Sequence, residues 1–164
     1  EVMLMNTGLF GFFILGYYNL IGAEFNGVTF GVIFCMLCTC NAGSHPANVL
    51  PIMLGYGLIS WLFQLVAPFA HGNFTLYLNA QAIVVGLCYA NGLSLLSDQY
   101  GWFWGMAAAI THYCMVTTTP LVHGGMCLYN GGFTAALICL ILVPELERFF
   151  KTKNERKALK AAKQ

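Results

Sequence analysis

The sequence predicts an all-α membrane protein, a polytopic bundle of about six transmembrane or half-spanning helices, some of them discontinuous. Hydrophobic residues make up 59% of the 164-residue chain and charged residues only 8%, whereas soluble domains carry about 25% charged residues. All seven lysines and arginines lie after residue 147. A polar, glycine-rich stretch at residues 117–133 separates two of the apolar runs. These observations together exclude an ordinary soluble domain.

The first three apolar runs differ in how well they fit a full crossing. Residues 2–21 are long enough for a span, whereas residues 28–40 are short and form either a flank-extended span or a half-span. Ser44 lies two positions before a proline, a pattern that predicts a helix start with the serine as N-cap. We expect this helix to cover residues 47–68 and to kink at Pro51.

The second half of the chain continues the same pattern. A fourth run covers residues 76–96, and a polar turn is expected at residues 97–101. A fifth run covers residues 102–119, and residues 134–144 beyond the polar stretch are strongly apolar. With six elements, both ends of the chain lie on the same side of the membrane.

The basic tail sets the expected orientation. We divide the chain into a transmembrane helical domain at residues 1–149 and a basic cytoplasmic tail at residues 150–164, because the positive-inside rule retains such segments in the cytoplasm. Residues 151–164 are expected to be an exposed helix or disordered. We interpret the tail as a solvated topology anchor in preference to a lipid-binding or nucleic-acid-binding segment.

The stretch at residues 117–133 is the expected location of function. Pro120 lacks an N–H and the paired glycines loosen the backbone, so a continuous helix is not expected. Free backbone groups at membrane depth must face protein or water, and such segments commonly form binding sites or pathways. We therefore expect residues 44–48 and 123–130, both beside helix interruptions, to approach each other near mid-membrane.

Few ionisable side chains lie outside the tail, and each has two interpretations. Asp98 is either a water-facing interfacial group or part of a polar site. His112 and His123 are either functional or satisfied packing residues, since an intramembrane ionisable group is costly to bury. Because the histidines lack the i, i+4 spacing typical of ligands, a metal site is a minor alternative.

The candidate pathway residues share polar side chains in or beside the apolar runs. They are His45, Asn48, Asn79, Asn91, Asp98, His112, Thr117, Thr118, Thr119, His123, Tyr129 and Asn130.

A short internal similarity suggests a repeat unit of a transporter-like fold. An aromatic-Asn-Gly triplet precedes an apolar run at residues 25–27 and again at residues 129–131. Internal repeats are common in transporters, and their interrupted spans often mark the binding site.

Three stretches resemble a family of prokaryotic membrane proteins, domain of unknown function 1576 (DUF1576). They are residues 43–51 (GSHPANVLP), residues 115–120 (MVTTTP) and residues 123–133 (HGGMCLYNGGF). The resemblance implies a membrane fold and gives weight to these stretches, but it implies no activity. It also implies a longer family protein, of which this chain would be the C-terminal half.

The expected function is a channel or transporter for a small polar solute or ion, through a pathway lined by broken helices. The alternatives are a membrane-embedded metal-dependent enzyme and an accessory or structural subunit of a larger membrane complex. The expected partners are the lipid bilayer, the solute, and a second copy or partner subunit. We expect neither an organic cofactor nor a nucleic-acid partner.

Overall fold

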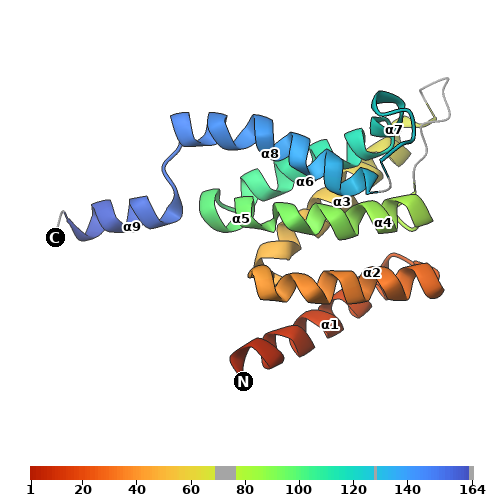
Figure 1. Cartoon of the computed structure of the whole chain (residues 1–164), viewed down its shortest axis with the longest axis horizontal. Coiled ribbons are helices and arrows are strands. Elements are labelled where there is room, and N and C mark those ends of the chain that lie inside the picture. The colour runs from red at the N-terminus through yellow and green to blue at the C-terminus, as the bar shows by residue number, and fades with distance from the viewer. Residues whose placement is uncertain (69–76, 128, 163–164) are drawn as a thin grey trace.

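The described part of the chain is a helical bundle from which the last helix projects (Figure 1). The structure is a computed structural model and describes residues 1–68, 77–127 and 129–162, which contain no strand. In chain order the elements are α1 (Val2–Leu20), α2 (Gly27–Cys38), η1 (Thr39–Ala42), α3 (Pro46–Val66), α4 (Gln81–Ala90), η2 (Asn91–Leu93), α5 (Ser94–Tyr100), α6 (Trp102–Val116), α7 (Thr119–Val122), α8 (Asn130–Phe149) and α9 (Lys153–Ala161).

Successive segments run up and down between two ends of the bundle (Figure 1). Asn6 donates a hydrogen bond to the Ser44 carbonyl at 2.9 Å, so α1 and α3 begin at the same end. We call this the tail end, because α8 also finishes there and leads into α9. Asn79, just before α4, donates to the carbonyl of Gly22, just after α1, at 3.4 Å. The end of α1 and the start of α4 therefore lie together at the opposite end of the bundle, which we call the far end.

In the core, α3 packs closely along α6. A Cβ added at Gly55 would lie 2.8 Å from the Met106 carbonyl oxygen, so only glycine allows this approach. Further along the same contact, the rings of Tyr56 and Tyr113 meet edge to face at 5.2 Å. The aromatic and backbone contacts fix these two helices as the centre of the bundle.

The start of α3 differs from the sequence prediction. His45, not Ser44, occupies the N-cap position. Asn48, inside the first turn, accepts a hydrogen bond from the His45 N–H at 2.9 Å, so the capping group comes from within the helix. The Ser44 hydroxyl instead lies 3.5 Å from that of Ser94. Pro51 lies inside α3, which continues on both sides of it.

The expected turn at residues 97–101 is also corrected. The helical path from α4 passes through η2 into α5 and ends at Tyr100, and the chain reverses at Gly101 with φ of 113°. Ser97 and Asp98 remain helical because Ser97 packs against Gly105 of α6 and the Asp98 carboxylate accepts a hydrogen bond from Asn48 of α3. Residues 70–73, where Gly72 and Asn73 between two apolar runs predict a loop, lie outside the described residues.

The chain is interrupted between α6 and α8, as the sequence predicted. Gly124 and Gly125 adopt left-handed φ values of 60° and 75°, which glycine tolerates without strain. The helix after the interruption extends beyond its apolar run at both ends, because α8 begins at Asn130 and continues through Pro144 to Phe149. In α9, Thr152 and Glu155 form a reciprocal capping box, which explains a helix at this end.

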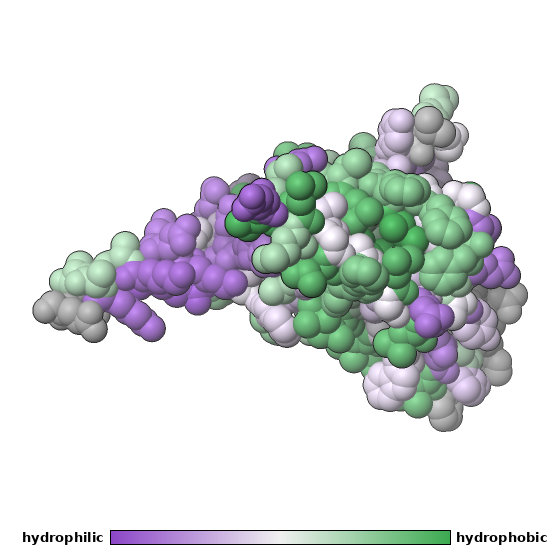
Figure 2. Space-filling model, turned by 90° about the horizontal axis from the view of Figure 1, so that it is seen from below, coloured by the Kyte–Doolittle hydropathy of each residue, from purple (hydrophilic) through white to green (hydrophobic). Residues whose placement is uncertain are grey.

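One helix among the described residues, α3, is long and apolar enough to cross a membrane by length and composition. Figure 2 shows hydrophobic residues over much of the visible face of the bundle and hydrophilic residues along the projecting tail. The all-helical prediction is confirmed.

Candidate functional site

Polar side chains gather at the tail end around Asp98. Asn48 is buried and donates to the Asp98 carboxylate at 2.6 Å and to the Gly43 carbonyl at 3.0 Å. His45 Nε2 lies 3.7 Å from the same carboxylate, and both side chains are 41% exposed. We call Ser44, His45, Asn48, Ser94 and Asp98 the Asp98 cluster. It places one carboxylate at a solvent-accessible opening of an otherwise apolar bundle.

Buried polar groups continue from this cluster along α5 and η2. Ser94 faces Ser44, and one turn deeper the Asn91 amide donates to the Thr39 hydroxyl at 2.5 Å. With a rise of 1.5 Å per residue, this row reaches roughly 10 Å inward from Asp98. Asn91 Oδ1 and Ser97 Oγ are buried without a protein partner within the described part of the chain. Such atoms are ordinarily hydrated, so the row is suited to water or a polar solute.

The basic tail lies beside the opening at Asp98. The Lys153 ammonium donates to the Ser97 carbonyl at 2.9 Å, and the Arg156 guanidinium donates to the Tyr100 carbonyl at 3.2 Å. These carbonyls end α5, where cations are favoured by the helix dipole. A cavity of about 530 Å³ lies between Asp98 and the tail residues Lys153 and Lys157.

His112 is buried where α3, α6 and α8 meet. Its Nε2 lies 2.9 Å from the Gly131 carbonyl, and its Nδ1 lies 2.6 Å from the Tyr56 hydroxyl. Because a carbonyl only accepts, Nε2 carries the proton. In the neutral imidazole, Nδ1 then accepts from Tyr56. Both ring nitrogens are satisfied, so His112 holds three helices together as well as placing an imidazole in the interior.

A second polar region lies in the interruption at the far end. Cys127 N–H donates to His123 Nδ1 at 3.2 Å, so the Nε2–H of a neutral His123 donates to Asn130 Oδ1 at 3.0 Å. The Asn130 amide in turn donates to the Val116 carbonyl at 2.6 Å. Asn130 thus ties the end of α6 to the start of α8.

A groove of about 640 Å³ opens beside Asn130, between α4 and the interruption. Polar groups come from Gln81, Thr117 and Asn130, while Tyr89 and Pro120 supply apolar surface. Gly131 lies so close to Tyr89 that an added Cβ would be 2.6 Å from its ring. We call this the far-end groove. Its mixture of amide, hydroxyl and aromatic groups suits a small polar molecule.

Among the described residues, the two interruptions have different partners, and the predicted approach of residues 44–48 to residues 123–130 is not found. Residues 44–48 contact Asp98 near the end of α5, whereas Asn130 shares a groove with Gln81 at the start of α4. Gly131, next to Asn130, packs against Tyr89, and along the helical path from α4 to α5 Tyr89 and Asp98 are about 14 Å apart. The first interruption lies at the tail end beside Asp98, whereas the second is followed by Gly131, which packs against Tyr89 of α4.

The other candidates are distributed between these regions. Thr119 is buried and accepts a hydrogen bond from Thr134 at 2.9 Å, whereas Thr118 is exposed and donates back to the Met115 carbonyl. Asn79 is exposed at the far end, where it bonds Gly22. Tyr129 is exposed, with its ring 6.3 Å from Tyr89.

Several residues of these regions were not among the candidates. Ser94 and Ser97 follow Asn91 at intervals of three, a helical polar stripe that periodicity reveals. Tyr56 and Tyr89 carry no comparable signal, because a tyrosine within an apolar run is equally typical of packing.

The described residues contain no group of three or more His, Cys, Asp or Glu side chains that could hold a metal ion. Asp98 and His45 make a pair, while His112 and His123 have other partners.

The triplets at residues 25–27 and 129–131 both lead into helices that begin at the far end. Their local roles differ. Asn26 Oδ1 caps α2 by accepting from the Val28 and Thr29 N–H groups, whereas Asn130 bonds His123 and Val116. The similar triplets therefore precede two helices, α2 and α8, that run in the same direction but are capped by different contacts.

The model of the family DUF1576, described as a protein of unknown function, matches residues 1–148. This match gives no support to the expectation that the chain is the C-terminal half of a longer member. Neither a curated protein nor a solved structure matches the chain. Because the family match covers the helical bundle from α1 almost to the end of α8, the chain belongs to the DUF1576 family.

Proposed function

We propose that this chain is a multi-pass membrane protein that passes a small polar solute or a weakly held cation. The Asp98 cluster and the far-end groove would form the two openings of its pathway. The observation that carries the proposal is a polar region at each end of the same helical path, α4 to α5, inside a bundle with an apolar exterior. The partners in this proposal are the lipid bilayer, the solute, and a second copy or another subunit.

The surface supports a membrane location. Large apolar side chains are exposed along α1, α3 and α8, including Phe12, Leu65 and Leu140. Large exposed apolar surfaces on helical proteins mark lipid or protein contacts. The helical path of α3 is about 31 Å long, which matches a hydrocarbon core of about 30 Å.

Aromatic residues mark two levels along the bundle. Trp102 and Phe103 are exposed at the tail end, while Tyr77 and Tyr129 are exposed at the far end. Tryptophan and tyrosine favour the two membrane–water interfaces. With the basic tail on the cytoplasmic side, both chain ends would lie in the cytoplasm and the far end outside.

The interior supports a pathway with a closed centre. From the tail end, polar groups reach Asn91; from the far end, they reach His112. Leu87 and Cys88 of α4, which precede Asn91, are buried. Polar groups within a membrane are costly and usually line pathways or sites. Opening this central layer would join the two polar regions.

A second copy or another subunit is part of the proposal because the far-end groove opens at the bundle surface. Its Gln81 and Thr117 are exposed. Backbone and amide groups at membrane depth require protein or water beside them. A neighbouring subunit over this groove would separate it from lipid.

The test is solute flux in proteoliposomes, followed by light scattering after an osmotic step with urea, polyols or potassium salts. Asn130→Leu should slow flux of every permeant solute, because it removes the amide at the far-end groove. Asp98→Asn should slow cations and spare neutral solutes. The matched controls are Asn41→Leu and Glu145→Gln, which alter exposed residues that line neither opening.

Absence of flux above that of empty liposomes would contradict the proposal and favour an accessory subunit. Flux that both pathway variants leave unchanged would contradict the assigned openings.

A further inference from the structure

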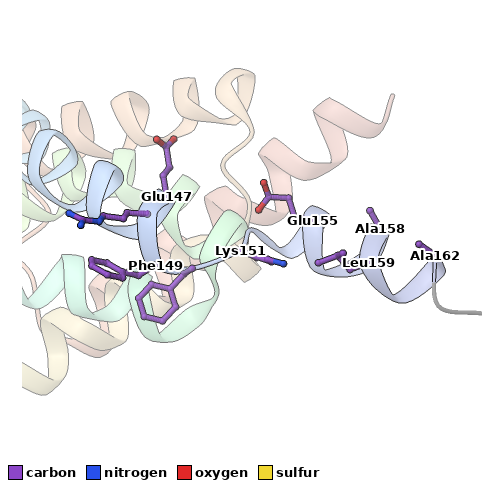
Figure 3. Close-up of a pocket in the computed structure, with 9 residues that line it drawn as sticks. Glu147, Phe149, Lys151, Glu155, Ala158, Leu159 and Ala162 are labelled. Carbon is purple, nitrogen blue, oxygen red and sulfur yellow. The ribbon is translucent and has the colours of Figure 1, made fainter.

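The junction of α8 and α9 carries a groove separate from both polar regions. Its volume is about 690 Å³. Figure 3 shows its residues coming from the last turn of α8, the short connection after it, and one side of α9.

The groove has an apolar surface that is exposed to its surroundings. The exposed fractions are 65% for Phe149, 44% for Phe150 and 43% for Leu159. The Phe150 ring is held against Trp104 of α6, with centroids 4.9 Å apart. This surface is therefore fixed to the bundle at the level of the tail-end aromatic residues.

Basic groups border the same surface. Arg148 and Lys151 line the groove, and the Arg148 guanidinium carbon lies 5.2 Å from the Phe149 ring centroid. In Figure 3, Glu147 and Glu155 point to one side, away from the Phe149 ring. The chain has no lysine or arginine before residue 148. Two basic and two acidic side chains therefore line the groove beside its apolar surface. Arg148 lies against the Phe149 ring, whereas the carboxylates of Glu147 and Glu155 are turned away from it (Figure 3).

We propose that this groove binds an anionic phospholipid, with its phosphate at Arg148 and Lys151 and its acyl chain along Phe149, Phe150 and Leu159. The proposal rests on the membrane location proposed above. A free phosphate would use only the basic groups and leave the apolar surface exposed. A lipid uses both, because the anionic headgroup and the acyl chain are covalently joined.

The test uses the full chain reconstituted in bilayers, with Trp104 as the reporter because it contacts Phe150. Trp61→Phe and Trp102→Phe remove the other tryptophans. Quenching of Trp104 fluorescence by brominated phosphatidylglycerol is compared with quenching by brominated phosphatidylcholine at equal mole fraction. We expect phosphatidylglycerol to be favoured by about fivefold for each basic contact at the surface.

Arg148→Gln with Lys151→Gln should abolish this preference and leave quenching by phosphatidylcholine unchanged. Leu159→Glu should also weaken it. Lys160→Gln removes a charge that does not line the groove and should preserve the preference.

Equal quenching by the two lipids, or a preference that survives the double substitution, would overturn the lipid site while leaving the membrane proposal intact. Loss of the preference on adding soluble glycerol phosphate would assign the site to a free anion instead. If neither brominated lipid quenches any tryptophan of the unsubstituted chain, the membrane location itself is contradicted.

Discussion

His112 shows how one side chain can join three helices. Its imidazole belongs to α6, and its two partners belong to α3 and α8. A buried polar group is tolerated when both its donor and acceptor are used. The structure therefore gives His112 a packing role, and the proposed pathway places it at the inner limit of the far-end region.

Replacing His112 with phenylalanine should destabilise the fold by about 2 to 4 kcal/mol, because it leaves the Tyr56 hydroxyl and the Gly131 carbonyl buried without their partner. Tyr56→Phe removes only a hydroxyl and should cost about 1 to 2 kcal/mol. Thermal unfolding of the purified chain measures both. Tyr129→Phe, at an exposed tyrosine, is the control. If Tyr56→Phe lowers the stability no more than Tyr129→Phe does, the hydrogen bond between Tyr56 and His112 contributes nothing.

Asn48 is the corresponding residue at the tail end. Asn48→Ala removes the cap of α3 together with the amide that donates to Asp98, and we expect a loss of about 1 to 3 kcal/mol. Asn41→Ala changes an exposed asparagine nearby and should have almost no effect. Equal unfolding temperatures of the two variants would contradict the capping role.

At the scale of elements, glycines determine how closely helices approach. At Gly55 an added Cβ would also lie 2.9 Å from Ala109 Cβ, and at Gly105 it would lie 2.6 Å from Ser97 Cβ. No atom lies within 4 Å of a Cβ added at Gly57, two residues from Gly55. The α3–α6 and α5–α6 contacts therefore depend on particular glycines.

Gly55→Ala should destabilise the bundle by about 1 to 3 kcal/mol, since neither the Met106 carbonyl nor Ala109 can move without shifting α6. Gly57→Ala faces open space and should stabilise α3 by up to about 1 kcal/mol through helix propensity. Chemical unfolding of the two variants provides the comparison. Similar stabilities would show that α3 and α6 can separate without cost.

The sequence predicted helices better than their ends and contacts. Apolar length located α1, α3 and α6, and glycine with proline located the interruption after α6. Residues 97–101 were misread because Ser97 and Asp98 are polar, yet they stay helical through contacts with α3, α6 and the tail. Both interruptions were identified, but local sequence carries no information on which end of a bundle each one occupies.

At the scale of the whole molecule, the up-and-down order brings α1 and α3 to start at the end where α8 finishes. A membrane crossing by every segment then places both chain ends on one side. This arrangement follows from the even number of antiparallel segments and does not depend on the solute.

A reporter fused after Gln164 should be active in the cytoplasm, because the basic residues precede it and are retained there. A reporter fused after Gly125, in the far-end interruption, should be active on the opposite side. Green fluorescent protein and alkaline phosphatase fusions distinguish the two sides. Activity of both fusions on one side would rule out the crossing of α8.

The concentration of basic residues at one end has an electrical consequence. A cell membrane is negative inside, and each unit charge carried across it changes in energy by about 2.3 kcal/mol per 100 mV. An inverted chain would place Lys153, Arg156 and the other tail cations at the outer, positive face. In the proposed orientation the resting voltage opposes that inversion, and the bundle itself has no lysine or arginine before Arg148 for the voltage to displace. A change in voltage would therefore act on a permeating cation more than on the helices around it.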